Sequence, residues 1–230
     1  MPSIKYSVLF KNKIRKFNKT TNVDPDKSIS IRSFLIGSIS QGVSEVTNIL
    51  ESEDIFSTIN CLKKLGVKIK KIGKKNYLIH GNGLGSLNIK KNGLLDFGNS
   101  GTCARLLIGI LSTTPNINVF LKGDKSLSKR SMLKLIDIMN KFGAEFYPKN
   151  KFNLPLRITS SEMPTGIFYK AGVSSQLKSA TILASANAYG RSTIIEDKNY
   201  ESRDHTENIL LKNSKILKIK YDKNKKTIKI

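Results

Sequence analysis

The sequence predicts an α/β protein made of three repeats of one unit, whose order is strand, helix, strand, helix, strand, strand. The first observation is a steady period, because the serines that open the first helices recur after 72 and 74 residues. These serines are Ser28, Ser100 and Ser174. The second observation is that the first helices carry apolar residues on nearly every face, which is typical of buried helices. We therefore expect three helices inside and the sheets outside, as an inside-out α/β barrel, since internal repetition outranks local patterns in deciding a fold.

Unit one is expected at residues 24–81. An apolar helix begins at Lys27 and ends before Gly42, which is a helix-stop signal. Ser52 caps a second helix with apolar residues on one face, and Gly66 lies at its C-terminal end. Strands are expected at residues 43–50, 67–72 and 77–80, and the last two form a hairpin.

Unit two is expected at residues 86–160 and repeats this pattern. Its first helix covers residues 99–111, and its second covers residues 126–142 and ends at Gly143. Strands are expected at residues 87–89, 118–122, 144–147 and 156–159.

Unit three is expected at residues 166–230. Its first helix runs from Ser174 to residue 188, and its second opens at Ser202. The serines at the second helices keep the same period, 74 and 76 residues apart, at Ser52, Ser126 and Ser202. Strands are expected at residues 167–169, 192–196, 216–221 and 227–230. Before the units, residues 1–23 contain one lysine-rich strand at residues 6–10 that has no partner nearby.

Composition narrows the class of protein. The chain has 230 residues, of which 39% are hydrophobic and 25% charged, as in a globular protein of one or two domains. It has no apolar run of about 18 residues, so we expect no membrane span. Its lysine-rich start lacks the apolar region of a secretory signal, so we expect a cytoplasmic protein. Cys61 and Cys103 read as buried thiols, and with two histidines we expect no metal site.

The net charge of +23 raises nucleic-acid binding as an alternative. Of the 40 basic residues, 33 are lysines scattered over turns, strand edges and the C-terminal segment. A nucleic-acid groove needs a basic stripe with interleaved aromatic residues, and the aromatic residues here fall in core patterns. Nucleic acid is therefore not the expected partner. Four of the seven arginines instead lie at the polar starts of predicted helices: Arg32, Arg105, Arg130 and Arg203.

The turn at residues 95–101 has the features of an anion site. Asn99 or Ser100 can cap the following helix, whose free N–H groups and positive dipole end attract anions. Gly101 lets a ligand approach the main chain, and Arg105 lies one turn into the helix. An ordinary capped helix is the alternative interpretation, and only the threefold recurrence favours a binding site.

Five motifs occur one after another between residues 24 and 230. They are Lys27-Ser28-Ile29-Ser30-x-Arg32, Gly98-Asn99-Ser100-Gly101-Thr102-x-x-Arg105, Ser126-Leu127-x-x-Arg130, Ser175-Gln176-x-Lys178-Ser179-Ala180 and Ser202-Arg203-Asp204-His205-Thr206-Glu207. Together they resemble the EPSP synthase (3-phosphoshikimate 1-carboxyvinyltransferase) family. The resemblance implies the enolpyruvyl transferase fold, in which two domains of three units each hold the substrates between them. It also implies transfer of the enolpyruvyl group from phosphoenolpyruvate to shikimate 3-phosphate, in aromatic amino acid biosynthesis, without a cofactor.

The resemblance also assigns site residues. Shikimate 3-phosphate is assigned to Lys27, Ser28, Arg32, Ser174, Ser175, Gln176 and Ser202. Phosphoenolpyruvate is assigned to Lys27, Asn99, Gly101, Arg130 and Gln176, and Lys27 is the expected catalytic residue. Further candidates are Thr102, Arg105, Arg203 and His205. The alternative for Ser28, Ser174 and Ser202 is that they only cap helices, and we expect Lys178 and Glu207 to pair with neighbours on their own helices.

Several interpretations remain open beside this one. The family's second domain is missing, so we expect one domain at residues 24–230 plus a stub, residues 1–23, that belongs with the missing domain. The chain is then a fragment, a truncated gene product or half of a split enzyme, inactive alone, with a separately encoded C-terminal domain as a candidate partner. The alternatives are UDP-N-acetylglucosamine enolpyruvyl transferase within the same fold, a non-catalytic remnant that binds shikimate 3-phosphate, and a basic anion- or nucleic-acid-binding module. Glyphosate sensitivity is also implied, because family members bind this inhibitor where phosphoenolpyruvate sits.

Overall fold

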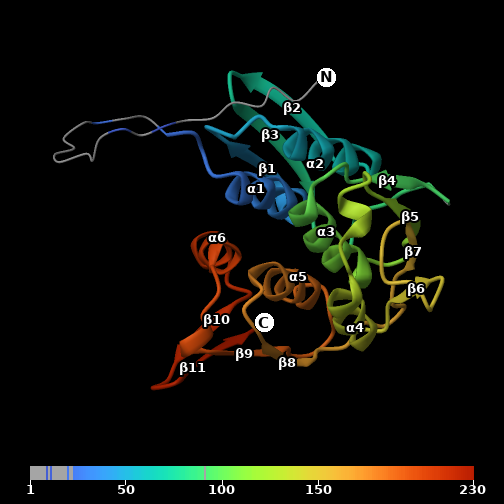
Figure 1. Ribbon diagram of the computed structural model, residues 1–230, viewed down its shortest axis with the longest axis vertical. Helices are drawn as coiled ribbons and strands as arrows, with labels where there is room; N and C mark the ends of the chain where they lie inside the picture. Colours follow the sequence, from blue (N-terminus) through green and yellow to red (C-terminus); the bar gives the residue numbers. More distant parts are fainter. Residues whose placement is uncertain (1–8, 10, 12–19, 21–22, 91) are drawn as a thin grey trace.

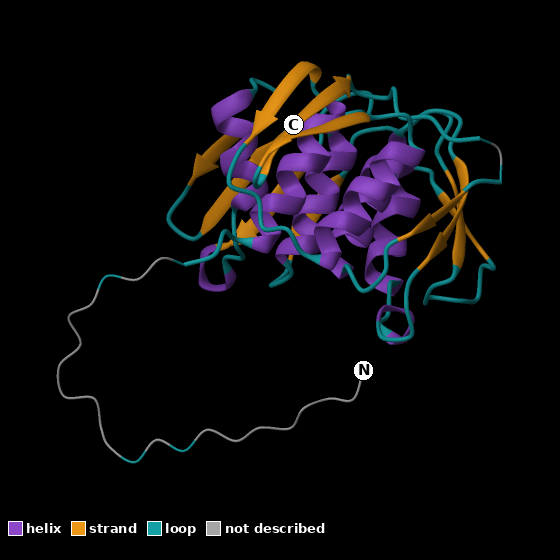
Figure 2. Ribbon diagram, turned by 90° about the horizontal axis from the view of Figure 1, so that it is seen from above, coloured by secondary structure: helices purple, strands orange, loops and turns teal. Residues whose placement is uncertain are grey.

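Three helices form the centre of the molecule and three sheets surround them. The computed structural model describes residues 23–230 apart from residue 91, together with residues 9, 11 and 20. The central helices are α1 (Lys27–Ile39), α3 (Gly101–Thr113) and α5 (Ser175–Ser185). Figure 1 shows them at the middle of the fold, and Figure 2 shows the strands outside the helical bundle. The predicted inside-out arrangement is confirmed, whereas the strand predicted at residues 6–10 lies outside the described residues except for Leu9.

Close packing of the central helices explains why they are apolar on nearly every face. Almost every residue of α3 is buried, as the sequence predicts. The backbones of α3 and α5 approach so closely that a Cβ atom at Gly109 would lie 2.6 Å from the carbonyl oxygen of Ala180. Glycine at this position therefore sets the distance between the two helices. Within the described residues, no helix is both long and apolar enough to cross a membrane.

Each unit contributes one sheet to the outside. The first has the antiparallel order β1-β3-β2, the second the order β4-β5-β7-β6, and the third the order β8-β9-β11-β10. In the second and third sheets the opening strand runs parallel to its neighbour, β4 to β5 and β8 to β9. The strands are β1 (Gln41–Val46), β2 (Lys68–Gly73), β3 (Asn76–Asn82), β4 (Leu94–Asp96), β5 (Asn118–Lys122), β6 (Glu145–Tyr147), β7 (Leu156–Thr159), β8 (Phe168–Ala171), β9 (Thr193–Asp197), β10 (Lys218–Tyr221) and β11 (Lys225–Lys229).

The second helix of each unit is shorter and lies nearer the surface. These helices are α2 (Glu53–Lys64), α4 (Leu133–Lys141) and α6 (His205–Asn213). In α2 the buried residues Ile55, Ile59 and Leu62 share one face, which is the pattern of an amphipathic helix. The predicted hairpin of unit one and the buried state of both cysteines are also confirmed.

The strand predicted at residues 87–89 is wrong. Leu87 is buried in the core, and the Asn88 N–H donates to the Leu65 carbonyl oxygen, but no ladder forms there. A buried apolar residue in a loop therefore produced the alternating sequence pattern that is typical of a strand. The opening strand of unit two is instead β4, which lies directly before the turn at Gly98.

The single helix predicted at residues 126–142 is also wrong. A short 3₁₀ turn, Leu127–Lys129, is followed by a break at Arg130, and α4 begins only at Leu133. Arg130 has extended backbone angles. The Ser131 hydroxyl then accepts a hydrogen bond from the N–H of Leu133, the first residue of α4. The break frees the Arg130 side chain to turn toward α3.

Three predicted boundaries shift by three or four residues, and others, such as both ends of α3, shift by one or two. Strand β1 ends at Val46 rather than at residue 50, because Asn48 turns the chain with a positive φ of 52°. Helix α5 ends at Ser185 rather than at residue 188. Helix α6 begins at His205, so Ser202 precedes the helix and does not cap it.

We predict that Gly109→Ala destabilises the fold by about 1–2 kcal/mol. The added methyl group meets the backbone of α5, which cannot rotate away, and overpacking of this kind costs about 1–3 kcal/mol, partly offset by the better helix propensity of alanine. Urea unfolding measures the change. Gly172→Ala is the matched control, since its Cβ atom meets nothing within 4 Å. Equal stability of the two variants would contradict the close contact.

Candidate active site

Arg32 connects the N-terminal halves of three helices. Its Nε donates to the Thr206 hydroxyl at 2.8 Å, on α6, and its Nη2 donates to the Ser179 hydroxyl at 2.9 Å, on α5. Its Nη1 donates to the carbonyl and hydroxyl oxygens of Ser28, on α1. The Thr206 hydroxyl also donates to Ser179. Helices from units one and three therefore begin at the same end of the bundle.

The Arg32 guanidinium is almost completely buried, with 1% of the residue exposed. Burial lowers the pKa of Arg32 below its ordinary value, while the carboxylates of Glu207 and Asp26 oppose this change and Arg203 adds to it. Arginine stays charged in proteins in spite of such shifts. A buried positive charge held mainly by hydroxyl groups therefore lies beneath this end of the bundle.

A second positive group surrounds the start of α3. The Arg130 Nη2 donates to the Asn99 Oδ1 at 2.9 Å, and the Arg105 Nη1 donates to the Gly101 carbonyl oxygen at 3.2 Å. A Cβ atom at Gly101 would lie 2.9 Å from the Arg105 Nη1 and 3.2 Å from the Arg130 Nη1, so both guanidinium groups reach this glycine. Burial, together with the nearby charge of Arg130, lowers the pKa of Arg105. Because these hydrogen bonds go to neutral oxygens, they leave the charge of both arginines available to an anion.

Gln176 connects the two groups. It lies in the first turn of α5, and its Nε2 donates to the Thr102 hydroxyl, in the first turn of α3, at 3.0 Å. Since Ser179 on α5 also bonds Arg32, α5 is the bridge between α1 and α3. The structure thus brings the starts of α1, α3, α5 and α6 together on one surface.

The remaining predicted residues lie around this surface. Lys27 is exposed and forms an ion pair with Asp54 on α2, at 3.0 Å. Ser174 caps α5 by accepting the Leu177 N–H, and Ser175 is the first residue of that helix. Asp26 rather than Ser28 caps α1, so the capping alternative holds for Ser174 and not for Ser28 or Ser202.

The segment before α6 carries Ser202, Arg203 and His205. Ser202 donates both its N–H and its hydroxyl to Glu196, so it is held by a side chain. Arg203 is exposed and close enough to Arg32 to influence its pKa. The buried His205 Nδ1 makes no hydrogen bond within the described residues.

Sequence reasoning missed the roles of Ser179, Thr206, Lys178 and Glu207. The local pairing predicted for Lys178 and Glu207 is wrong, because these two residues form an ion pair with each other across α5 and α6 at 2.8 Å. Ser179 and Thr206 lie next to them and carry the hydroxyl contacts to Arg32. All four residues lie inside two of the five motifs that carry the family resemblance, which was the available signal. A single sequence does not show which distant residues they contact.

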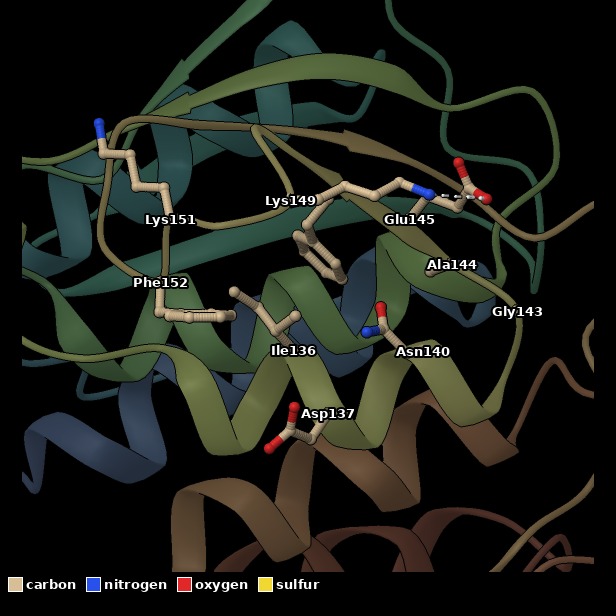
Figure 3. Close-up of a pocket in the computed structure, with 10 residues that line it drawn as sticks. Ile136, Asp137, Asn140, Gly143, Ala144, Glu145, Lys149, Lys151 and Phe152 are labelled. Atoms are coloured by element: carbon tan, nitrogen blue, oxygen red, sulfur yellow. Dashed lines mark ion pairs between the residues drawn. The ribbon is translucent and has the colours of Figure 1, made fainter.

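The charge and the donors of this surface suit anions better than metals. Within the described residues, no group of three or more His, Cys, Asp or Glu side chains could hold a metal ion. A separate pocket on unit two, lined in part by Ile136, Asp137 and Phe152 (Figure 3), shares no residue with this surface. Helix starts, hydroxyl groups and guanidinium groups together favour binding of phosphate or carboxylate groups.

Comparison with known proteins agrees with this geometry. The family model for EPSP synthase (3-phosphoshikimate 1-carboxyvinyltransferase) matches residues 11–230. The chain belongs to the EPSP synthase family. A 3-phosphoshikimate 1-carboxyvinyltransferase from Paramagnetospirillum magneticum is 40% identical over 192 residues, and one from Caldicellulosiruptor bescii is 43% identical over 198 residues. These alignments cover 83% and 85% of this chain.

A solved structure gives the same result for the fold. EPSP synthase from Acinetobacter baumannii is similar with a TM-score of 0.80 and 34% sequence identity over 90% of this chain. The match covers 46% of that protein, and the two curated relatives are covered over 42% and 44% of their lengths. The chain therefore spans less than half the length of the family members it matches.

We predict that Arg32→Lys destabilises the protein by about 2–3 kcal/mol. A lysine ammonium cannot reach hydroxyl groups on three helices at once, and hydrogen bonds to charged groups contribute about 1.5–3 kcal/mol each. Thermal and urea unfolding measure the loss. Arg191→Lys, at an exposed position, is the control and leaves stability unchanged. Unchanged stability of the Arg32 variant would mean that the three contacts do not hold the helices.

Proposed function

We propose that this chain forms the shikimate 3-phosphate-binding part of an enzyme that transfers the enolpyruvyl group from phosphoenolpyruvate to shikimate 3-phosphate. The observation that carries the proposal is the gathering of four helix starts, with their hydroxyl and guanidinium groups, in a member of the EPSP synthase family. Both substrates are anions, and such a surface supplies the donors that they require. Phosphorylated substrates do not cross membranes unaided, so a cytoplasmic location is part of the proposal.

Shikimate 3-phosphate is proposed to lie over the starts of α1, α5 and α6. Its ligands at the start of α5 are Ser174, Ser175 and Gln176, and those at the start of α1 are Lys27, Ser28 and Arg32. Ser202, in the segment before α6, is a further ligand. Arg32 donates four hydrogen bonds inside the protein, and since a guanidinium has five N–H groups, one remains for the substrate. Its larger contribution is to orient Ser28.

Phosphoenolpyruvate is proposed to lie over the start of α3. Asn99, Gly101 and Arg130 form one side of this site, and Gln176 and Lys27 border it. The adjacent charges of half-buried Arg105 and exposed Arg130 support this placement, because two neighbouring cations attract an anion more strongly than one. Lys27 is the proposed catalytic residue, with Thr102, Arg105, Arg203 and His205 as further candidates.

The complete reaction is proposed to need a second domain. The family members that match this chain are more than twice as long as the aligned region. The resemblance to the family places the acidic groups for proton transfer in the second domain. Residues 1–23 are proposed to belong with that domain. Among enzymes of the same fold, Lys27-Ser28 favours shikimate 3-phosphate over a UDP-sugar substrate, for which Lys-Asn is typical.

We predict that the 230-residue chain binds shikimate 3-phosphate more tightly than phosphoenolpyruvate, and turns over neither. Most ligands proposed for the first substrate lie in this chain, whereas the second depends on a further domain. Calorimetry with each compound tests the order of affinities. Ser175→Ala is expected to weaken shikimate 3-phosphate about three- to tenfold, since one hydrogen bond contributes about 0.5–1.5 kcal/mol. Ser33→Ala, which removes a hydroxyl bonded within its own helix, is the control. A reversed order, or an equal loss in both variants, contradicts the assignment.

We predict that Gly101→Ala weakens the binding of glyphosate about ten- to a hundredfold or more, and that it weakens the binding of phosphoenolpyruvate less. The methyl group would press on the guanidinium groups of Arg105 and Arg130, and crowding of a filled site costs about 1–3 kcal/mol. Glyphosate is the longer of the two ligands and loses more. The measurement is inhibition of a fusion of residues 1–230 with a compatible second domain.

The control for that fusion is Gly172→Ala, which adds the same methyl group in open space close to the start of α5. Resistance of the unsubstituted fusion to glyphosate would mean that Gly101 does not line the phosphoenolpyruvate site. Unchanged inhibition of the Gly101→Ala fusion would have the same consequence.

A further inference from the structure

Unit three contains four charged side chains in its interior. Lys178 on α5 contacts Glu196 on β9 and Glu207 on α6, both at 2.8 Å. Lys226 on β11 lies 3.7 Å from Glu196 and 3.6 Å from Glu207. None of the four is more than 3% exposed. We call these residues the buried ion cluster, and its formal charges cancel.

The fold of a unit does not require such a cluster. The repeat places Ala104 of unit two at the position of Lys178, since each lies four residues after the capping serine of its helix. Leu121 is the fourth residue of β5, as Glu196 is of β9. Leu156 pairs with Leu121 in the register in which Lys226 pairs with Glu196. The three residues of unit two are buried and apolar, so the same architecture forms with an apolar interior.

Stability gives little reason for the charges. Replacing a buried ion pair by well-packed apolar residues is often neutral or stabilising, because desolvation of the ions offsets their attraction. The reason for the charges therefore lies in another residue that the cluster contacts. That contact is Ser202, a residue proposed above to bind shikimate 3-phosphate.

Glu196 and Lys178 hold every polar group of Ser202. The Glu196 Oε1 accepts the Ser202 N–H at 2.7 Å and its hydroxyl at 2.8 Å, and the Lys178 Nζ donates to the Ser202 carbonyl oxygen at 3.2 Å. The segment has no helical or strand structure at Ser202, so side chains replace the backbone partners that would otherwise fix it. Burial by itself raises the pKa of Glu196, but the bonds from Lys178 and Ser202 prevail and lower it, which keeps the carboxylate ionised.

The cluster also reaches the Arg32 network. Lys178 precedes Ser179 on α5, and Glu207 follows Thr206 on α6. The Lys178–Glu207 ion pair and the Ser179–Thr206 hydrogen bond are thus two adjacent connections between the same helices. Ser202 and Arg32 are consequently fastened to one rigid assembly.

We propose that Glu196, held in place by Lys178, is a positioning residue that sets Ser202 for the phosphate group of shikimate 3-phosphate. The inference rests on the proposed function. The Ser202 hydroxyl has one proton, which it donates to Glu196 in this structure, so it reaches a phosphate by rotation about its Cα–Cβ bond. The Ser202 N–H stays on Glu196 during this rotation, and the main chain keeps its place.

The test compares two variants with the same change of charge. Glu196→Gln and Glu207→Gln each remove one negative charge from the buried ion cluster, but of these two carboxylates only Glu196 bonds Ser202. If the cluster acts only through its charge, both variants attract an anion more strongly. If Glu196 positions Ser202, Glu196→Gln binds shikimate 3-phosphate about tenfold more weakly, while Glu207→Gln binds it at least as well as the unsubstituted chain. Calorimetry on the 230-residue chain gives both affinities, and thermal unfolding verifies that each variant is folded.

A double-mutant cycle with Ser202→Ala separates positioning from general damage. In the Ser202→Ala background, Glu196→Gln is expected to lower the affinity for shikimate 3-phosphate by less than a further twofold, because the two changes act on the same contact. Independent, multiplying losses would overturn the proposal, as would equal behaviour of the two glutamine variants.

Two further outcomes are also decisive. Should Glu196→Gln fail to fold, the charge-balanced variant Glu196→Gln/Lys226→Met takes its place, with the same tenfold loss expected, and unchanged binding by it overturns the proposal. Failure of the unsubstituted chain to bind shikimate 3-phosphate would count against the proposed function itself, and the inference would fall with it. Binding by the unsubstituted chain with no loss in Glu196→Gln would refute the inference alone.

Discussion

The contacts of Arg32 with hydroxyl groups on three helices are the constraint on which the candidate site depends. Its partners lie 147 and 174 residues away along the chain, so the contacts exist only when units one and three are correctly assembled. A buried guanidinium that loses a partner leaves an unsatisfied charged donor, which is costly. Sliding α5 or α6 by one helical turn would cause such a loss. The register of the helix starts, and with it the placement of Ser28 and Ser175, is therefore fixed from beneath the site.

The three central helices follow one plan but differ in charge at their starts. Helix α1 is capped by the carboxylate of Asp26, whereas α3 and α5 are capped by the neutral hydroxyl groups of Ser100 and Ser174. A neutral cap leaves the positive end of the helix dipole uncompensated. The starts of α3 and α5 are thus more attractive to anions than the start of α1, where Lys27 and Arg32 supply the positive charge. One repeated scaffold in this way gives its helix starts different electrostatic environments.

The sequence predicted the scaffold better than the contacts within the site. Its period and the apolar residues on nearly every face of the central helices were enough to place α1, α3 and α5 inside. Local patterns failed where tertiary contacts override them, as at buried Leu87 and at the break before Leu133. Arg130 shows the consequence: the sequence placed it near a helix start, but its extended backbone aims it at Asn99 instead. Pairings such as Lys178 with Glu207 depend on how two helices meet, which a single sequence does not display.

Comparison of the repeats connects the two buried cations. Arg32 and Lys178 both lie four residues after the serine that recurs at the first helices, and Ala104 occupies this position in unit two. Units one and three thus carry a desolvated positive charge beneath the helix start, whereas in unit two Arg130 is exposed and Arg105 is half-buried. A cation beneath the surface acts by holding neighbouring groups, since water no longer competes for its donors. A cation at the surface is free to contact a ligand. Units one and three therefore carry the buried cations that hold the helix starts together, and unit two carries the cations that can reach a ligand.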